Sequence, residues 1–188
     1  MAIAALLVVA VGMLSVLYSG ISSQASLTIS VVAFTVILTM SFFIHEMAHK
    51  ITAQRKGLWS EFRLTLWGSV MTLIFAFLPI KFISPGAVMI AGAAERKEIG
   101  EISIAGPITN IVLSILFLGT AFASGPYSQI FLFGGFFNAY IASFNLAPFG
   151  ILDGHKILNW SKIIWGLAFA TSAALTAIGY IMYSQYLQ

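Results

Sequence analysis

The sequence contains no cysteine and very little charge. Only 8% of its 188 residues are Asp, Glu, Lys or Arg, whereas 60% are hydrophobic. The lack of cysteine excludes a disulfide framework, a thiolate metal site and a cysteine nucleophile. The net charge of +3 is too small and too dispersed for nucleic-acid binding, so we expect no nucleic-acid partner. A mean hydropathy of +0.98 excludes an ordinary soluble domain and indicates a protein of the lipid bilayer.

Six apolar segments are long enough to enter a membrane. They comprise residues 2–18, 27–50, 64–80, 104–123, 130–147 and 160–183. The first lacks a basic region and a small-residue cleavage site, so we interpret it as an uncleaved span rather than a signal peptide. The third contains Gly68 and ends at Pro79, which makes it marginal for a full crossing. The pattern predicts an all-α polytopic membrane protein with five or six transmembrane or re-entrant helices.

Basic residues predict which ends of these segments face the cytoplasm. Arg55 and Lys56 follow segment 27–50 and are typical of a cytoplasmic anchor. If segment 64–80 dips into the membrane and returns, the later basic residues between 96 and 162 also face the cytoplasm. If segment 64–80 crosses, those residues move outside. We favour the first arrangement because it obeys the positive-inside rule, and the second stays open.

The pentapeptide His-Glu-Met-Ala-His occupies residues 45–49, inside the second apolar segment. On a helix His45 and His49 lie one turn apart on the same face, so both imidazoles can reach one metal ion. Glu46 lies beside that face, where it can take a proton from an activated water. Ionisable side chains at membrane depth cost roughly 2.5–3.5 kcal/mol each, and a metal site would compensate. The alternative, two histidines bonded to neighbouring carbonyls, leaves Glu46 unexplained. His49 lies roughly 9 Å inside Arg55 along a helix, near the cytoplasmic side.

Asp153 is the only aspartate in the chain, and it follows an apolar segment that is broken by Pro148. A helix broken at membrane depth is tolerated where the freed backbone groups are buried in protein or line a wet cavity. Hydrolytic zinc sites take three protein ligands and a water, and two histidines with a carboxylate are an established set. Asp153 is therefore the natural third ligand. The alternatives are a hydrated Asp153 that caps a helix over residues 155–160, and ligation through His155.

Three motifs resemble those of the site-2 proteases, a family of intramembrane zinc metalloproteases, and in particular its compact prokaryotic or archaeal members. They are the metal-binding helix at residues 45–49, the Ala-Gly-Pro-x-x-Asn segment at 105–110, and the Asn-x-x-Pro…Leu-Asp-Gly signature at 145–154. Together they frame a core over residues 27–160. We expect a single intramembrane metalloprotease domain over residues 1–188, with no PDZ or CBS-type domain.

The resemblance implies that His45, His49 and Asp153 bind one Zn²⁺ per chain and that Glu46 is the catalytic acid and base. It implies a multi-pass protein of the cell membrane whose active site lies within the bilayer near the cytoplasmic side. The implied activity is that of a metalloendopeptidase, which hydrolyses transmembrane segments of other membrane proteins. These transmembrane-helix substrates and the lipid bilayer are the expected partners, whereas the sequence does not indicate the oligomeric state.

The family motifs also imply functional roles for two asparagines, and for each of them a structural role stays open as the alternative. The resemblance implies that Asn110 projects towards the site, where it would donate to the developing oxyanion or position the substrate backbone. Asn145 is expected to bind substrate. Asn110 would otherwise be a packing amide bonded between helices, and Asn145 would otherwise satisfy the backbone that Pro148 frees.

The resemblance also implies a small membrane-associated β region. Its strands would be residues 60–65 and 84–91, with segment 64–80 as an insertion between them. A strand in this region would be able to accept an extended substrate by edge addition. Only one span follows the Leu-Asp-Gly motif. We therefore expect the gate through which the substrate enters to be simpler than one built from two later helices.

Three other protein classes stay open. A metalloprotease of another lineage would complete the metal site with a glutamate, but the glutamates other than Glu46 all lie in polar stretches. A catalytically silent membrane adaptor of the same fold would bind substrates without cutting them, and the intact Glu46 disfavours it. A metal-ion transporter would need polar residues along several spans, and few occur beyond Asn110 and Asn138.

Overall fold

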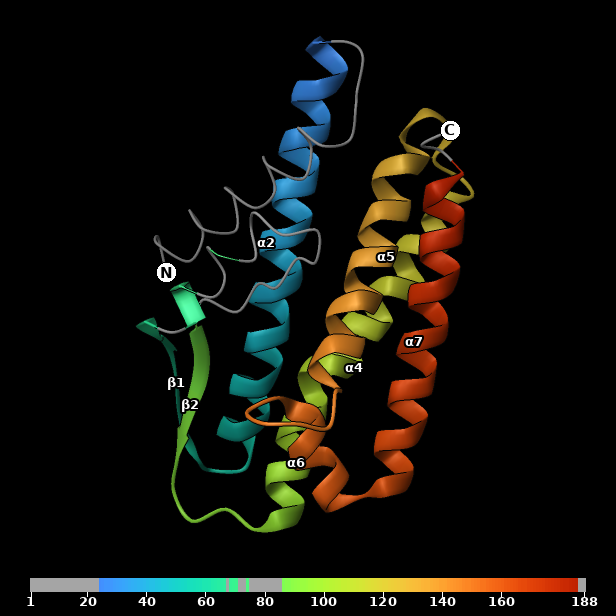
Figure 1. The fold of residues 1–188 in the computed structure, drawn as a ribbon. Helices are drawn as coiled ribbons and strands as arrows, with labels where there is room; N and C mark the ends of the chain where they lie inside the picture. The colour runs from blue at the N-terminus through green and yellow to red at the C-terminus, as the bar shows by residue number, and fades with distance from the viewer. Residues whose placement is uncertain (1–23, 67, 71–73, 75–85, 186–188) are drawn as a thin grey trace.

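The computed structural model describes residues 24–66, 68–70, 74 and 86–185. These residues form helices and one two-stranded sheet (Figure 1). In chain order the elements are α2 (Gln24–Arg55), β1 (Trp59–Leu64), β2 (Gly86–Ala91), α4 (Arg96–Ala121), the 3-10 turn η1 (Gly125–Tyr127), α5 (Ser128–Asn145), α6 (Asp153–Trp160) and α7 (Lys162–Ser184). The predicted span 2–18 and most of segment 64–80 lie outside the described residues.

Three of the described helices are long and apolar enough to cross a membrane. They are α2 over Val32–Arg55, α4 and α7. Helix α5 is shorter, at 18 residues, and packs against both α4 and α7. The predicted fold class, an all-α polytopic membrane protein with a small β region, is confirmed.

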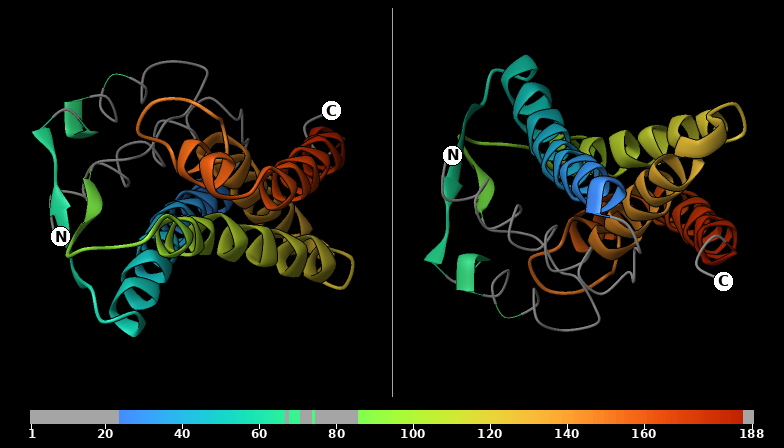
Figure 2. Two further views of the ribbon diagram at one scale, coloured as in Figure 1. Left: turned by 90° about the horizontal axis from the view of Figure 1, so that it is seen from below. Right: turned by 90° about the horizontal axis from the view of Figure 1, so that it is seen from above.

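Helix α4 is the element around which the other helices assemble. It contacts α2, α5, α6 and α7. The end-on views of Figure 2 show the β strands and α7 on opposite sides of the molecule, with the other helices between them. Phe34 and Leu38 of α2 pack on Phe133 and Phe137 of α5, and the rings of Phe34 and Phe133 stack with centroids 4.1 Å apart. Lipid tails are as apolar as these side chains, so the hydrophobic effect does not drive the helices together inside a bilayer. Close packing of this kind holds them together instead.

Helix α4 begins well before the predicted span. It starts at Arg96, because Glu95 and Glu98 form a capping box around its first turn. The Glu98 carboxylate accepts the Glu95 N–H at 3.0 Å. An ion pair between Lys56 and Glu101 then ties the start of α4 to the end of α2. The polar stretch before the predicted span is therefore helical.

Strands β1 and β2 pair antiparallel beside α2 (Figure 1). The register places Trp59 opposite Ala91 and Leu64 opposite Gly86, so both predicted strands are present with slightly different ends. At Ala91 the chain has thus returned to the level at which it left α2. The basic end of α2 and the basic start of α4 therefore lie at the same end of the bundle, as the favoured topology requires.

The loop between α5 and α6 folds back against the bundle. Gly150 adopts φ +64°, a left-handed conformation that favours glycine. Gly154 lies so close to the carbonyl of Leu146 that a Cβ would overlap it. The indole N–H of Trp165 in α7 donates to the same carbonyl at 2.8 Å. These contacts turn the first residue of α6, Asp153, towards the other helices.

Candidate metal centre

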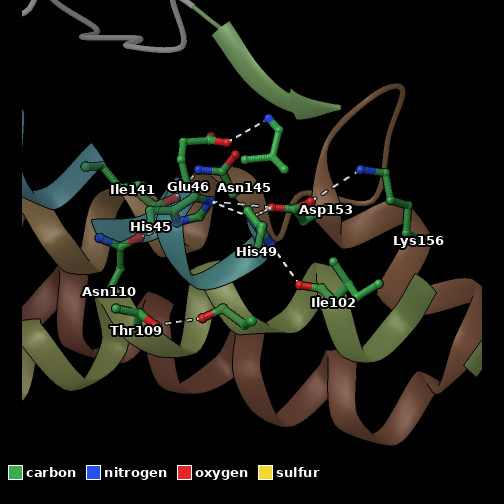
Figure 3. A network of polar contacts seen from close by, with 12 residues as sticks. His45, Glu46, His49, Ile102, Thr109, Asn110, Ile141, Asn145, Asp153 and Lys156 are labelled. Atoms are coloured by element: carbon green, nitrogen blue, oxygen red, sulfur yellow. Dashed lines mark hydrogen bonds and ion pairs between the residues drawn. The ribbon is translucent and has the colours of Figure 1, made fainter. Parts of the chain in front are cut away.

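Helix α2 and the start of α6 together carry the candidate metal ligands (Figure 3). His45 and His49 lie one turn apart in α2, and their Nε2 atoms are 3.1 Å apart. The Oδ2 atom of Asp153 lies 3.5 Å from His45 Nε2 and 3.0 Å from His49 Nε2. All three residues are buried. The structure therefore brings together the three predicted ligands from elements far apart in the chain.

This donor set fits a zinc ion. Two imidazole nitrogens and one carboxylate oxygen are the ligand types of a three-ligand hydrolytic zinc site. A tetrahedral ion with bonds of roughly 2.0–2.1 Å separates its ligand atoms by about 3.3 Å. The three separations of 3.0, 3.1 and 3.5 Å bracket that value. The residues present are thus of the right type and spacing for zinc.

Each imidazole is also held through its other nitrogen. His49 Nδ1 donates to the backbone carbonyl of Ile102 at 2.8 Å, and His45 Nδ1 contacts Oδ1 of Asn110. Both partner oxygens are acceptors, so each ring carries a proton on Nδ1. The two Nε2 atoms face each other and the Asp153 carboxylate, which is favourable only with a metal ion or a proton between them. Metal-bound histidines almost always make such a second hydrogen bond.

Gly106 of α4 leaves the space in which the two Nε2 atoms meet. A Cβ at this position would overlap the imidazoles of both His45 and His49. Only glycine therefore allows α4 to approach α2 this closely at the site. The glycine of the Ala-Gly-Pro segment has a direct steric role at the candidate metal centre.

Asp153 has partners on both of its oxygens. Oδ2 faces the histidines, and Oδ1 lies 3.4 Å from Nζ of Lys156, which is one turn further along α6. Burial raises the pKa of the Asp153 carboxyl, but charge attraction from His49 and Lys156, together with hydrogen bonds from both histidines, outweighs it and holds the pKa well below its ordinary value. The group is therefore the carboxylate, which is the form that binds metal.

Glu46 lies beside the ligands (Figure 3) and lines a pocket. Its Oε2 atom accepts the backbone N–H of Val88 in β2 at 3.1 Å. Both residues line a pocket of about 150 Å³ that also reaches Asn145 and Asp153. This volume admits several water molecules. A carboxylate in the wall of a pocket that can admit water, beside a candidate metal site, is able to act as a general base.

The two predicted asparagines occupy different environments. Asn145 lines the pocket, and its Nδ2 donates to the carbonyl one turn earlier in α5 at 3.0 Å. Asn110 is fully buried behind His45. Its Nδ2 donates to the Ser41 carbonyl at 3.3 Å and to Oδ1 of Asn138 at 2.8 Å. The amide of Asn110 is thus engaged between helices, and Asn145 is the one that borders the pocket.

Neither His155 nor a second glutamate joins the ligand cluster. His155 is exposed on α6, and its Nε2 contacts the side chain of Asn159 at 3.1 Å. The other glutamates make separate contacts on β1 and in the first turns of α4, and they are Glu61, Glu95, Glu98 and Glu101. The described residues therefore offer no glutamate as a third metal ligand, which a metalloprotease of another lineage would require.

Sequence reasoning missed several groups that support the site. The N–H of Val88 and the carbonyl of Ile102 belong to the main chain, so no residue type marks them. Asn138 was noticed only as a polar residue within a span. Lys156 was counted only among the basic residues expected to face the cytoplasm, although its spacing of three residues from Asp153 in a helix indicates contact.

The chain is similar to known proteins. Residues 33–129 match a family model described as peptidase family M50. A "putative zinc metalloprotease" of Methanocaldococcus jannaschii is 34% identical over 153 residues, which are 77% of this chain and 76% of the relative. The "putative zinc metalloprotease Rip2" of Mycolicibacterium smegmatis is 30% identical over 138 residues, 64% of this chain and 53% of that protein. No solved structure matches the chain.

Proposed function

The chain belongs to peptidase family M50, and from this premise we propose that it cleaves transmembrane segments of other membrane proteins within the bilayer. As a member of the family it is a zinc metalloendopeptidase and a multi-pass membrane protein. The observation that carries the proposal is the convergence of His45, His49 and Asp153 to within 3.0–3.5 Å, with both histidines in a helix that is long and apolar enough to cross a membrane.

We assign the chemistry to four side chains. His45, His49 and Asp153 hold the zinc ion, and Glu46 transfers the proton. When bound, zinc supplies Lewis acidity, which lowers the pKa of a coordinated water towards neutrality and polarises a carbonyl. Oε2 of Glu46 accepts from Val88, so Oε1 is the atom that takes the proton of the attacking water. The same carboxyl then gives that proton to the amine nitrogen of the leaving peptide.

The edge of β2 beside the pocket suits an extended substrate. Strand β1 pairs with one edge of β2, and no strand of the described residues pairs with the other. Val88 and Ile90 line the 150 Å³ pocket and also a second pocket of about 380 Å³. A helix engages its own carbonyls in hydrogen bonds, so the scissile bond must be unwound before attack. Addition to β2 as a strand would hold it unwound, with Asn145 binding the substrate backbone.

We place the active site near the cytoplasmic face of the membrane. Helix α2 continues to Arg55, so His49 lies roughly 9 Å inside the basic end of this helix. The Lys56–Glu101 ion pair brings the basic start of α4 to the same end. Positive residues at one end are typical of the cytoplasmic side. Water would enter the pocket from that side.

The direct test is cleavage of labelled transmembrane peptides by the purified full-length chain in lipid nanodiscs. We expect cleavage by the parent and none by Glu46→Gln, which keeps the shape of the side chain and loses its basicity. Glu61→Gln is the matched control, because Glu61 lies exposed on β1 and pairs with Arg63. Normal cleavage by Glu46→Gln would contradict the proposed chemistry. Peptide binding by the parent without cleavage would identify an adaptor instead.

A further inference from the structure

Two asparagines lie completely buried behind the candidate metal centre. Asn110 of α4 and Asn138 of α5 have no exposed surface. A buried amide that lacks hydrogen-bond partners destabilises a protein, and both of these amides donate as well as accept. Asn110 contacts His45, the Ser41 carbonyl and Asn138. Asn138 contacts the carbonyl of Gly134 one turn earlier in its own helix.

The backbone fixes the direction of these hydrogen bonds. The Gly134 carbonyl can only accept, so Nδ2 of Asn138 faces it and donates at 2.8 Å. Oδ1 of Asn138 therefore faces Asn110 and accepts from its Nδ2 at 2.8 Å. The same Nδ2 also donates to the Ser41 carbonyl at 3.3 Å. Both N–H groups of Asn110 are thus engaged, and its Oδ1 is turned towards His45.

This chain of hydrogen bonds determines which nitrogen of His45 carries the proton. A neutral imidazole donates from one nitrogen and accepts at the other. Nδ1 of His45 faces the Oδ1 acceptor of Asn110 and so carries the proton. The lone pair then lies on Nε2, the atom directed at His49 and Asp153. That tautomer is the one able to bind a metal through Nε2.

We infer that Asn110 and Asn138 are positioning residues that hold His45 in the tautomer and orientation needed for zinc binding. The inference rests on the proposed zinc site and deepens it. For Asn110 it replaces the oxyanion role expected from the sequence, because both N–H groups of this amide are engaged away from the pocket. His49 needs no such relay, because the backbone carbonyl of Ile102 serves the same purpose.

Zinc affinity tests the relay without relying on catalysis. The full-length chain carrying Glu46→Gln is titrated with zinc against a competing chelator, so that activity plays no part. We expect Asn110→Leu and Asn138→Leu each to weaken zinc binding by roughly 10- to 100-fold. Asn138→Asp, as the neutral acid, keeps one donor and one acceptor and should restore the parent affinity. Ser114→Ala is the matched control, because Ser114 is buried on α4 without a hydrogen-bond partner.

The tautomer of His45 is the second readout, and its measurement in the parent does not depend on the folding of any relay variant. ¹⁵N NMR of the zinc-free protein, at a pH where the imidazoles are neutral, distinguishes Nδ1–H from Nε2–H. The chain has only three histidines, which simplifies the assignment. We expect His45 to be protonated on Nδ1 in the parent, and to populate both tautomers in Asn138→Leu.

Three results would overturn the inference. The first is protonation of His45 on Nε2 in the parent. The second is unchanged zinc affinity in both leucine variants, even if their melting temperatures fall, since that pattern indicates packing alone. The third is a loss of cleavage in Asn110→Leu with zinc affinity unchanged, which would favour the oxyanion role. Failure of the proposed function is a separate result, seen as absence of cleavage by the parent with both readouts intact.

Discussion

Replacement of Gly106 by alanine would place a methyl group where the metal-binding nitrogens meet. The new Cβ would lie 2.6 Å from His45 Nε2, whereas ordinary contacts begin at 3.4 Å. The imidazole would therefore have to recede by about 0.8 Å. Zinc sites tolerate errors of only about 0.2 Å in ligand distance. The shift is large enough to remove at least one histidine from the coordination sphere.

The expected consequence of Gly106→Ala is loss of zinc and of activity from a folded protein. A displacement of about 1 Å at a catalytic centre costs roughly 100-fold in rate, so we expect kcat/KM to fall by at least that factor. Overpacking by one methyl group costs roughly 1–3 kcal/mol of stability. We therefore expect the variant to fold, with less than one zinc ion bound per chain.

The assay measures zinc per chain after dialysis, together with peptide cleavage and the melting temperature. Gly119→Ala is the matched control in the same helix, because a Cβ at Gly119 meets nothing within 4 Å. It should keep zinc and activity, and removing a helical glycine should stabilise the protein by roughly 0.5–1 kcal/mol. A Gly106→Ala protein with normal zinc content and normal cleavage would refute the steric reasoning.

Three further predictions follow from the contacts of the site. Asp153→Ala should abolish stoichiometric zinc binding, measured by mass spectrometry, whereas His155→Ala should keep both zinc and cleavage, because His155 is exposed and outside the cluster. Val88→Pro removes the N–H that orients Glu46. A hydrogen bond to a charged group contributes about 1.5–3 kcal/mol, so kcat should fall roughly 10- to 100-fold with zinc content unchanged. Ile90→Pro removes an N–H two residues further along the same strand edge without touching Glu46, so it should raise KM and leave kcat unchanged, and an equal fall in kcat there would point to damage of the strand. Removal of zinc by a chelator should stop cleavage, and zinc at about 1,000 times its Kd should stabilise the fold by about 4 kcal/mol. The melting temperature of Asp153→Ala should not respond to zinc in this way.

The two histidines were the most predictable part of the site. They belong to one helix, so their spacing alone sets their relative geometry. Asp153 was harder, because its approach depends on the loop that Gly150 and Gly154 allow to fold back. Its unique occurrence beside a broken span and the family signature indicated its role, and the geometry followed only from the structure.

Other features could not be predicted for physical reasons. The rotation of α4 about its axis decides whether Asn110 faces a pocket or a neighbouring helix, and one sequence does not fix that rotation. The N–H of Val88 is a main-chain group of a kind that nearly every residue has. Helix α4 starts before the predicted apolar span, because hydropathy leaves out charged residues even where Glu95 and Glu98 cap a helix.

X-ray absorption at the zinc edge tests the central claim most directly. For the purified, zinc-loaded chain we predict two imidazole nitrogens at roughly 2.0–2.1 Å and a carboxylate oxygen at roughly 2.0–2.2 Å from the metal. The carboxylate contribution should disappear in Asp153→Ala, and one imidazole should disappear in either His45→Ala or His49→Ala. A zinc ion bound by three imidazoles, or a spectrum that Asp153→Ala leaves unchanged, would contradict the assignment of His45, His49 and Asp153 as the ligands.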